Sequence, residues 1–188
     1  METFQELTDI ELVERAIEGD EKSFEEIVRR YQHPIVSYIY RMTGDYETSL
    51  DIAQEVFIKV YSNLSSYRSN YRFSTWIYKI AHNATIDYLR RDHKSQEVQS
   101  ETNFLRLESQ NPTPQKESEV KELLEEIRSV IGCLPTNYRE LILLRHSQDL
   151  SYEEIAEITG LPIGTVKNRL FRARAEIKKL LARRGFNF

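Results

Sequence analysis

The chain lacks several features that define large classes of protein. Its single cysteine, Cys133, cannot form an internal disulfide, and neither it nor the four His belong to a clustered metal-ligand pattern. We therefore expect no metal and no cofactor, and we expect Cys133 to be a small buried residue at a helix end. No apolar run approaches the ~20 residues of a membrane span, and the acidic N-terminus lacks the basic and apolar segments of a signal peptide. These absences predict a cytoplasmic protein that does not insert into a membrane.

Charge is distributed unevenly, although the net charge is only −4. Residues 161–188 contain eight Lys or Arg and one Glu, which gives +7, whereas residues 1–30 contain four bases and ten acids, which gives −6. Local fields rather than net charge steer association, so an acidic beginning and a basic end indicate at least two partner surfaces. The basic end favours DNA as one of these partners.

Strand patterns are absent, and helix signals follow one another along the chain. The predicted helices cover about residues 8–19, 20–44, 46–63, 74–91, 117–132 and 136–146, followed by the C-terminal segment described below. Between the fourth and fifth helices, Ser, Gln, Asn and Glu dominate, a composition that cannot bury enough apolar surface to offset its ordering entropy. We therefore predict an all-α protein with two small helical domains, residues 1–92 and 117–188, joined by a flexible linker, residues 93–116.

The last part of the second domain has the layout of a helix-turn-helix. Ser151 with Glu154 predicts a capping box, Gly160 suits a helix end, Pro162 lies in the turn, and Thr165 is a suitable cap for the second helix. At helical spacing, this second helix buries an apolar stripe and exposes basic, amide and aromatic side chains that suit base edges and phosphates in the major groove. A solvated cationic helix is the alternative, and the capped first helix and the turn make it less favourable. The predicted duplex-binding residues are Thr165, Lys167, Asn168, Arg169, Phe171, Arg172 and Arg174.

Two long motifs, in this order, resemble those of the bacterial extracytoplasmic function (ECF) sigma factors, a group of RNA polymerase sigma subunits. The first lies in DIAQEVFIKVY, residues 51–61, and FSTWIYKIAHNATIDYLRR, residues 73–91. The second is LPTNYRELILLRHSQDLSYEEIAEITGLPIGTVKNRLFRAR, residues 134–174. The resemblance implies that the chain is not itself an enzyme. It implies a first domain that binds core RNA polymerase and opens the promoter around the −10 element, and a second domain that reads the −35 element as duplex.

The resemblance also assigns roles to particular side chains. One side of the third helix would meet the polymerase clamp helices, although a carboxylate-rich helix side taken alone is more often simply solvated. The candidate polymerase-binding residues are Asp51, Gln54, Glu55 and Ile58. The polymerase flap is a further expected partner, as is an anti-sigma factor that would hold both halves of the free protein.

The loop over residues 65–72 and the next helix would bind the separated non-template strand. Such binding needs aromatic or amide surfaces for an unstacked base and cations for the backbone. The candidate residues are Tyr67, Arg68, Asn70, Tyr71, Arg72, Lys79 and Asn83, with Arg90 and Arg91 as contacts to upstream duplex phosphates. Cations at a helix C-terminus also interact with the helix dipole, which is a second explanation for Arg90 and Arg91. Trp76 could act as a melting wedge, but its helical spacing with Ile77 and Ile80 favours the core.

Two other functions compete with this interpretation. A stand-alone helix-turn-helix regulator would need a dimer interface or an effector pocket in residues 1–92, and it leaves both segments of the N-terminal motif, residues 51–61 and 73–91, unexplained. An enzyme acting on nucleic acid could use His82 and Asp87 as an acid and base pair. These two residues are five apart, so they do not stack on one helix face, and no nucleophile or metal cluster accompanies them.

Overall fold

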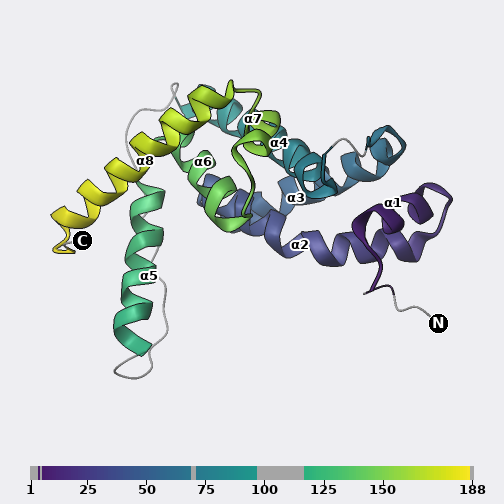
Figure 1. Cartoon of the computed structure of the whole chain (residues 1–188), viewed down its shortest axis with the longest axis horizontal. Coiled ribbons are helices and arrows are strands. Elements are labelled where there is room, and N and C mark those ends of the chain that lie inside the picture. Colours follow the sequence, from purple (N-terminus) through teal and green to yellow (C-terminus); the bar gives the residue numbers. More distant parts are fainter. Residues whose placement is uncertain (1–3, 5, 69–70, 97–116, 187–188) are drawn as a thin grey trace.

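The computed structural model describes residues 4, 6–68, 71–96 and 117–186, and of residues 93–96, 117–123 and 147 it describes the backbone alone. Every regular element within these ranges is a helix, which confirms the predicted all-α class (Figure 1). The helices are α1 Asp9–Ile17, α2 Glu21–Thr43, α3 Tyr46–Asn63, the short 3₁₀ helix η1 Leu64–Ser66, α4 Phe73–Gln96, α5 Glu117–Gly132, α6 Thr136–Ser147, α7 Tyr152–Thr159 and α8 Ile163–Arg183. No described helix combines the length and the apolar character needed to cross a membrane.

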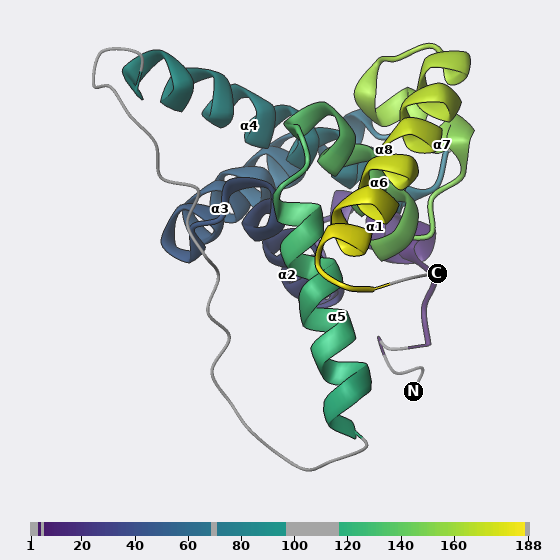
Figure 2. The ribbon, with the colours of Figure 1, turned by 90° about the vertical axis from the view of Figure 1, so that its left-hand side faces the viewer.

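Two domains follow from the packing of these helices. In the first domain, α2 contacts α1, α3 and α4, and apolar residues such as Ile39, Val56 and Ile77 are fully buried between them. In the second domain, α6, α7 and α8 pack on one another around residues such as Leu144 and Val166. Helix α5 contacts α6 and α8 and projects from the body of the molecule as an arm (Figures 1 and 2).

Local sequence signals set most of the helix ends. The backbone N–H of Thr8 donates to the Glu11 carboxylate at 2.7 Å, and the reciprocal bond completes the predicted capping box of α1. Ser151 caps α7 in the same way. Gly44 and Gly160 end α2 and α7 in the left-handed conformation, with φ of 80° and 68°, which a glycine adopts without steric cost.

Three expectations differ from the structure. Thr165 is not the cap of α8, because the Pro162 carbonyl already accepts the N–H of Thr165 at 2.8 Å and the helix starts at Ile163. Cys133 is exposed rather than buried, since it follows the end of α5 and lies 3.8 Å from the Arg184 guanidinium at the surface. Helix α4 continues to Gln96, past the helix end predicted at about residue 91, while residues 97–116 of the predicted linker lie outside the described residues.

The two domains lie against each other. Helix α7 packs beside α4 (Figure 1), and α2 contacts α6. The buried apolar residues of both domains therefore form one continuous core. The sequence signals are all local to one domain or the other and did not predict this contact. It brings the first helix of the helix-turn-helix next to the predicted single-strand surface.

Candidate nucleic-acid and protein interfaces

Helix α8 presents a basic and aromatic face to solvent. Its predicted apolar stripe is buried, with Val166, Leu170 and Ala173 at no more than 1% exposure. On the opposite side, the side chain of Phe171 is 73% exposed. Burying such a ring is worth about 1.5–3 kcal/mol, so Phe171, with cations beside it, is a candidate contact for a ligand.

Five of the seven predicted duplex-binding residues share this exposed face. They are Lys167, Asn168, Phe171, Arg172 and Arg174. Thr165 and Arg169 are half-buried and lie at its margin. Burial raises the pKa of Glu140 in α6, and the charge of Arg169 partly offsets this rise.

Tyr152, the first residue of α7, supports the start of the α8 face. The Nζ of Lys167 lies 5.8 Å from the centre of the Tyr152 ring, and the Arg145 guanidinium lies 5.4 Å from it. These are cation–π distances, so the ring holds one cation from α6 and one from α8. The contact orients the Lys167 stem while its ammonium remains accessible.

A second basic face follows α4. Lys79, Asn83 and Arg90 are spaced by four and seven residues and therefore share one stripe of the helix. Asn83 and Arg90 are exposed, and Lys79 is half-buried. The Nε of Arg91 donates to the Asp87 carbonyl at 3.3 Å. Glu55, Lys59, Ala84, Asp87, Arg90 and Arg91 line a hollow of about 450 Å³ between α3 and α4.

The loop before α4 is anchored by Tyr67. Its ring packs edge-on against Phe73 at 5.4 Å and tilted against Trp76 at 5.6 Å, and its hydroxyl donates to the Tyr71 carbonyl at 2.8 Å. Trp76 is half-buried against the core, in keeping with the core assignment. The rings of Tyr67 and Tyr71 therefore differ in availability, because Tyr71 is exposed and Tyr67 is partly covered.

Two further loop residues complete the predicted single-strand set. Arg68 is exposed, as is the Arg72 side chain that precedes α4. Asn70 lies outside the described residues.

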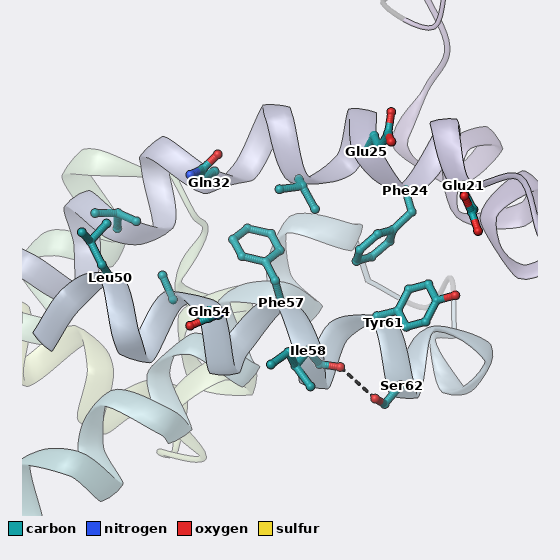
Figure 3. A pocket seen from close by; sticks show the side chains of 13 residues that line it. Glu21, Phe24, Glu25, Gln32, Leu50, Gln54, Phe57, Ile58, Tyr61 and Ser62 are labelled. Atoms are coloured by element: carbon teal, nitrogen blue, oxygen red, sulfur yellow. Dashed lines mark hydrogen bonds between the residues drawn. The ribbon is translucent and has the colours of Figure 1, made fainter. Parts of the chain in front are cut away.

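The outer side of α3 carries the predicted polymerase-binding residues. Asp51, Gln54, Glu55 and Ile58 are all exposed, and the Ile58 side chain is 60% exposed. The Glu55 carboxylate pairs with Lys59 at 2.6 Å, and this hydrogen bond lowers its pKa. Of the four, Gln54 and Ile58 also line a groove of about 600 Å³ between α2 and α3 (Figure 3).

Sequence reasoning missed the aromatic part of that groove. Phe24 of α2 and Tyr61 of α3 meet edge to face at 4.9 Å (Figure 3). Helical periodicity places Tyr61 with Phe57 and Val60 on the apolar face of α3, yet Tyr61 is 60% exposed. The spacing of three residues between Ile58 and Tyr61 is the signal that could have identified a second apolar strip on the outer side of α3.

Polar contacts cross from one domain to the other. Thr75 donates its hydroxyl proton to Glu154 at 3.0 Å, and Lys79 pairs with Glu157 at 2.5 Å. Arg139 of α6 donates to the Met42 carbonyl at the end of α2 at 3.0 Å. None of these glutamates carried a functional signal in the sequence, because a charged residue on a helix is usually just solvated.

A buried polar group lies deeper in the same seam. The Nδ1 of His82 is 3.5 Å from the Tyr38 hydroxyl and 3.8 Å from the Glu140 carboxylate, and both His82 and Glu140 are less than 8% exposed. Burial lowers the pKa of His82 to about 4 and raises the pKa of Glu140 to about 7. Asp87 is exposed and pairs with Arg90 instead, so the structure does not bring His82 and Asp87 together as an acid and base pair.

Comparison with known proteins gives a consistent result for both domains. The family profile "Sigma-70 region 2" matches residues 27–95, and "Sigma-70, region 4" matches residues 124–177. The ECF RNA polymerase sigma-E factor of Escherichia coli K12 is 40% identical over 182 residues, which cover 92% of this chain and 94% of that protein. The chain belongs to the ECF RNA polymerase sigma factors.

Other relatives extend the comparison. The ECF sigma factor SigW of Bacillus subtilis is 36% identical to this sigma factor over 176 residues, which cover 90% of this chain and 94% of that protein. Among solved structures, CnrH in complex with the cytosolic domain of CnrY has a TM-score of 0.69 at 24% identity, covering 93% of this chain and 97% of that one. The similarity to the CnrH structure shows the same fold over both domains. In this sigma factor, α3 and α4 belong to the region 2 match and α7 and most of α8 to the region 4 match.

Proposed function

We propose that this sigma factor binds core RNA polymerase and directs it to promoters, reading the −35 element as duplex through α8 and the −10 element as melted non-template strand through α4. The observation that carries the proposal is the exposed basic and aromatic face of α8 around Phe171, and the partly exposed basic stripe on α4 supports it. Chemical catalysis would belong to the polymerase.

The α8 face suits base readout in the major groove. Asn168 can pair bidentately with adenine, Arg172 can pair bidentately with guanine, and the Phe171 ring can contact a thymine methyl. Lys167 and Arg174 flank these residues, where ammonium and guanidinium groups reach phosphates. Direct readout by Arg172 would thus give specificity, while Lys167 would give affinity that depends little on sequence.

The α4 stripe and its loop suit a single strand. Arg72, Lys79 and Arg90 provide cations along one side of the helix, Asn83 lies between them, and Tyr71 exposes an aromatic ring at the loop end. A stacking surface and a line of cations are the two requirements for single-strand binding. Tyr67 would act by holding the loop, because its ring and hydroxyl are already engaged.

The outer side of α3 suits a helical protein partner. Ile58 and Tyr61 expose apolar surface beside the groove between α2 and α3, and Asp51 and Glu55 lie next to it with negative charge. An amphipathic helix with a basic flank fits such a surface. We assign it to the polymerase clamp. Solved relatives include CnrH with CnrY and RpoE of Bartonella quintana with the anti-sigma factor NepR, which supports an anti-sigma partner for this chain as well.

Reconstitution with core RNA polymerase tests this proposal. Transcripts begun on genomic DNA are sequenced for the wild type, for Arg172→Ala and for Arg183→Ala, which removes the same charge near the end of α8. We expect Arg172→Ala to cost about 1–3 kcal/mol at preferred promoters and to relax one position of the −35 element. The Arg183 variant should keep the wild-type preference. Failure to associate with core polymerase, together with unaided tight binding to symmetric duplex sites, would instead favour the stand-alone regulator.

A further inference from the structure

The contact between the domains covers part of the α4 stripe. Three donors along the start of α4 meet carboxylate oxygens of α7: Arg72, Thr75 and Lys79. Their distances to Glu154 or Glu157 are 3.9 Å, 3.0 Å and 2.5 Å in that order. A guanidinium, a hydroxyl and an ammonium are the same groups that hold phosphate oxygens along a nucleic-acid strand.

The two carboxylates thus occupy positions suited to strand phosphates. Both are anionic oxygen acceptors, and they reach α4 from one side of α7 because Glu154 and Glu157 are three residues apart on that helix. A strand could engage all three donors together only by displacing them, because Thr75 is 1% exposed and bonded to Glu154, whereas the Arg72 and Lys79 side chains remain 77% and 43% exposed. The occupant of the basic surface in this structure is therefore another segment of the same chain.

We propose that Glu154 and Glu157 form an electrostatic latch, in which the helix-turn-helix domain closes the single-strand surface of α4 in the free chain until a partner separates the domains. The inference rests on the proposed role of α4. It adds that the free sigma factor masks its own strand-binding residues, so that strand affinity depends on the fraction of molecules whose domains are apart.

The chemistry of the latch favours a reversible contact. The side chains of Lys79 and Glu157 are 43% and 35% exposed, so water and salt screen this pair and its strength is modest. Glu154 has a second task, because its carboxylate also accepts the Ser151 N–H in the capping box at 2.9 Å. Among the contacts described, Glu157 pairs only with Lys79, which makes it the cleaner position to change.

The test compares Glu157→Gln with Glu153→Gln in the full chain. Both variants remove one negative charge from α7, but Glu153 is exposed and has no described contact with α4. Binding of a dye-labelled, random-sequence single strand of about 12 nucleotides is followed by fluorescence anisotropy. We expect Glu157→Gln to bind about two- to fivefold more tightly than the wild type, since loss of one exposed ion pair shifts the closed state by that factor. Glu153→Gln should change the single-strand affinity only by the general effect of removing one negative charge.

Small-angle scattering of the same samples reports domain separation without any DNA. An increased radius of gyration for Glu157→Gln, together with tighter strand binding, supports the latch. Equal strand affinity for the wild type and Glu157→Gln, with measurable binding in both, overturns it. If no variant binds the strand while the Glu157→Gln protein still expands, the assignment of α4 to single-strand binding fails and masking fails with it, although the domain contact stands.

Discussion

Replacing either partner of the buried His82–Glu140 pair should produce opposite pH dependences of stability. In the folded protein the pKa of Glu140 is raised from 4.5 to about 7, and the pKa of His82 is lowered from 6.5 to about 4, in both cases chiefly by burial. Nearby charges act in a minor way: Arg169 lowers the pKa of Glu140, while Arg90 lowers and Asp87 raises that of His82. Each group therefore disfavours the folded state when it is charged.

The magnitude follows from linkage. Each pKa differs by about 2.5 pH units between the folded and unfolded chain, and at about 1.4 kcal/mol for each unit this amounts to about 3 kcal/mol. For Glu140, whose folded pKa is raised, the contribution to stability is present below pH 4.5 and is lost as the pH rises through about 7. For His82, whose folded pKa is lowered, it is present above pH 6.5 and is lost as the pH falls through about 4. Between pH 4.5 and pH 6.5 the two contributions change in opposite directions, so the free energy of unfolding of the wild type depends little on pH through this pair.

Urea unfolding followed by circular dichroism across this pH range measures these slopes. Glu140→Gln leaves His82 alone, and the free energy of unfolding should fall by about 3 kcal/mol as the pH decreases from above 6.5 to 4. His82→Gln leaves Glu140 alone, and the fall should have the same size as the pH increases from 4.5 to above 7. His33→Gln, at an exposed position of α2, is the matched control and should keep the wild-type profile. Parallel profiles for all four proteins would refute the assignment of these pKa shifts.

Two further perturbations test local features. Ser151→Ala removes the capping box of α7 and should lower the free energy of unfolding by about 1 kcal/mol in the same urea assay, whereas Ser65→Ala, at an exposed position of η1, should change it little. Ile58→Asp should weaken binding to core polymerase about 5- to 30-fold in a pull-down titration, because about 1–2 kcal/mol of apolar burial is lost. Ile17→Asp alters a comparably exposed apolar residue on α1, and an equal loss there would argue against a specific role for Ile58.

Local patterns predicted the elements well because their causes are local. The capping boxes at Thr8 and Ser151 depend on residues three positions apart, and both form as expected. The buried stripe of α8 follows from helical periodicity, which also places Phe171 on the outside. Thr165 failed as a cap because two plausible starts lay within one turn, and the carbonyl of Pro162 supplied the earlier one.

The contact between the domains could not be predicted in this way. Lys79 and Glu157 are 78 residues apart, and nothing in either segment indicates the other. The sequence around Glu140 is that of an ordinary exposed helical glutamate, yet the residue is buried beside His82 of α4. The groove beside α3 could be predicted only in part. Helical spacing shows which residues of α3 share a face, but the exposure of Tyr61 depends on how α2 crosses α3.

Glu154 joins two processes through one carboxylate, since it accepts the first N–H of its own helix turn and a hydroxyl from the neighbouring module. Fraying at Ser151 would therefore weaken the docking of the modules, and undocking would leave that turn with one stabilising bond fewer. The first turn of α7 and the docking of the modules should accordingly be lost together on heating.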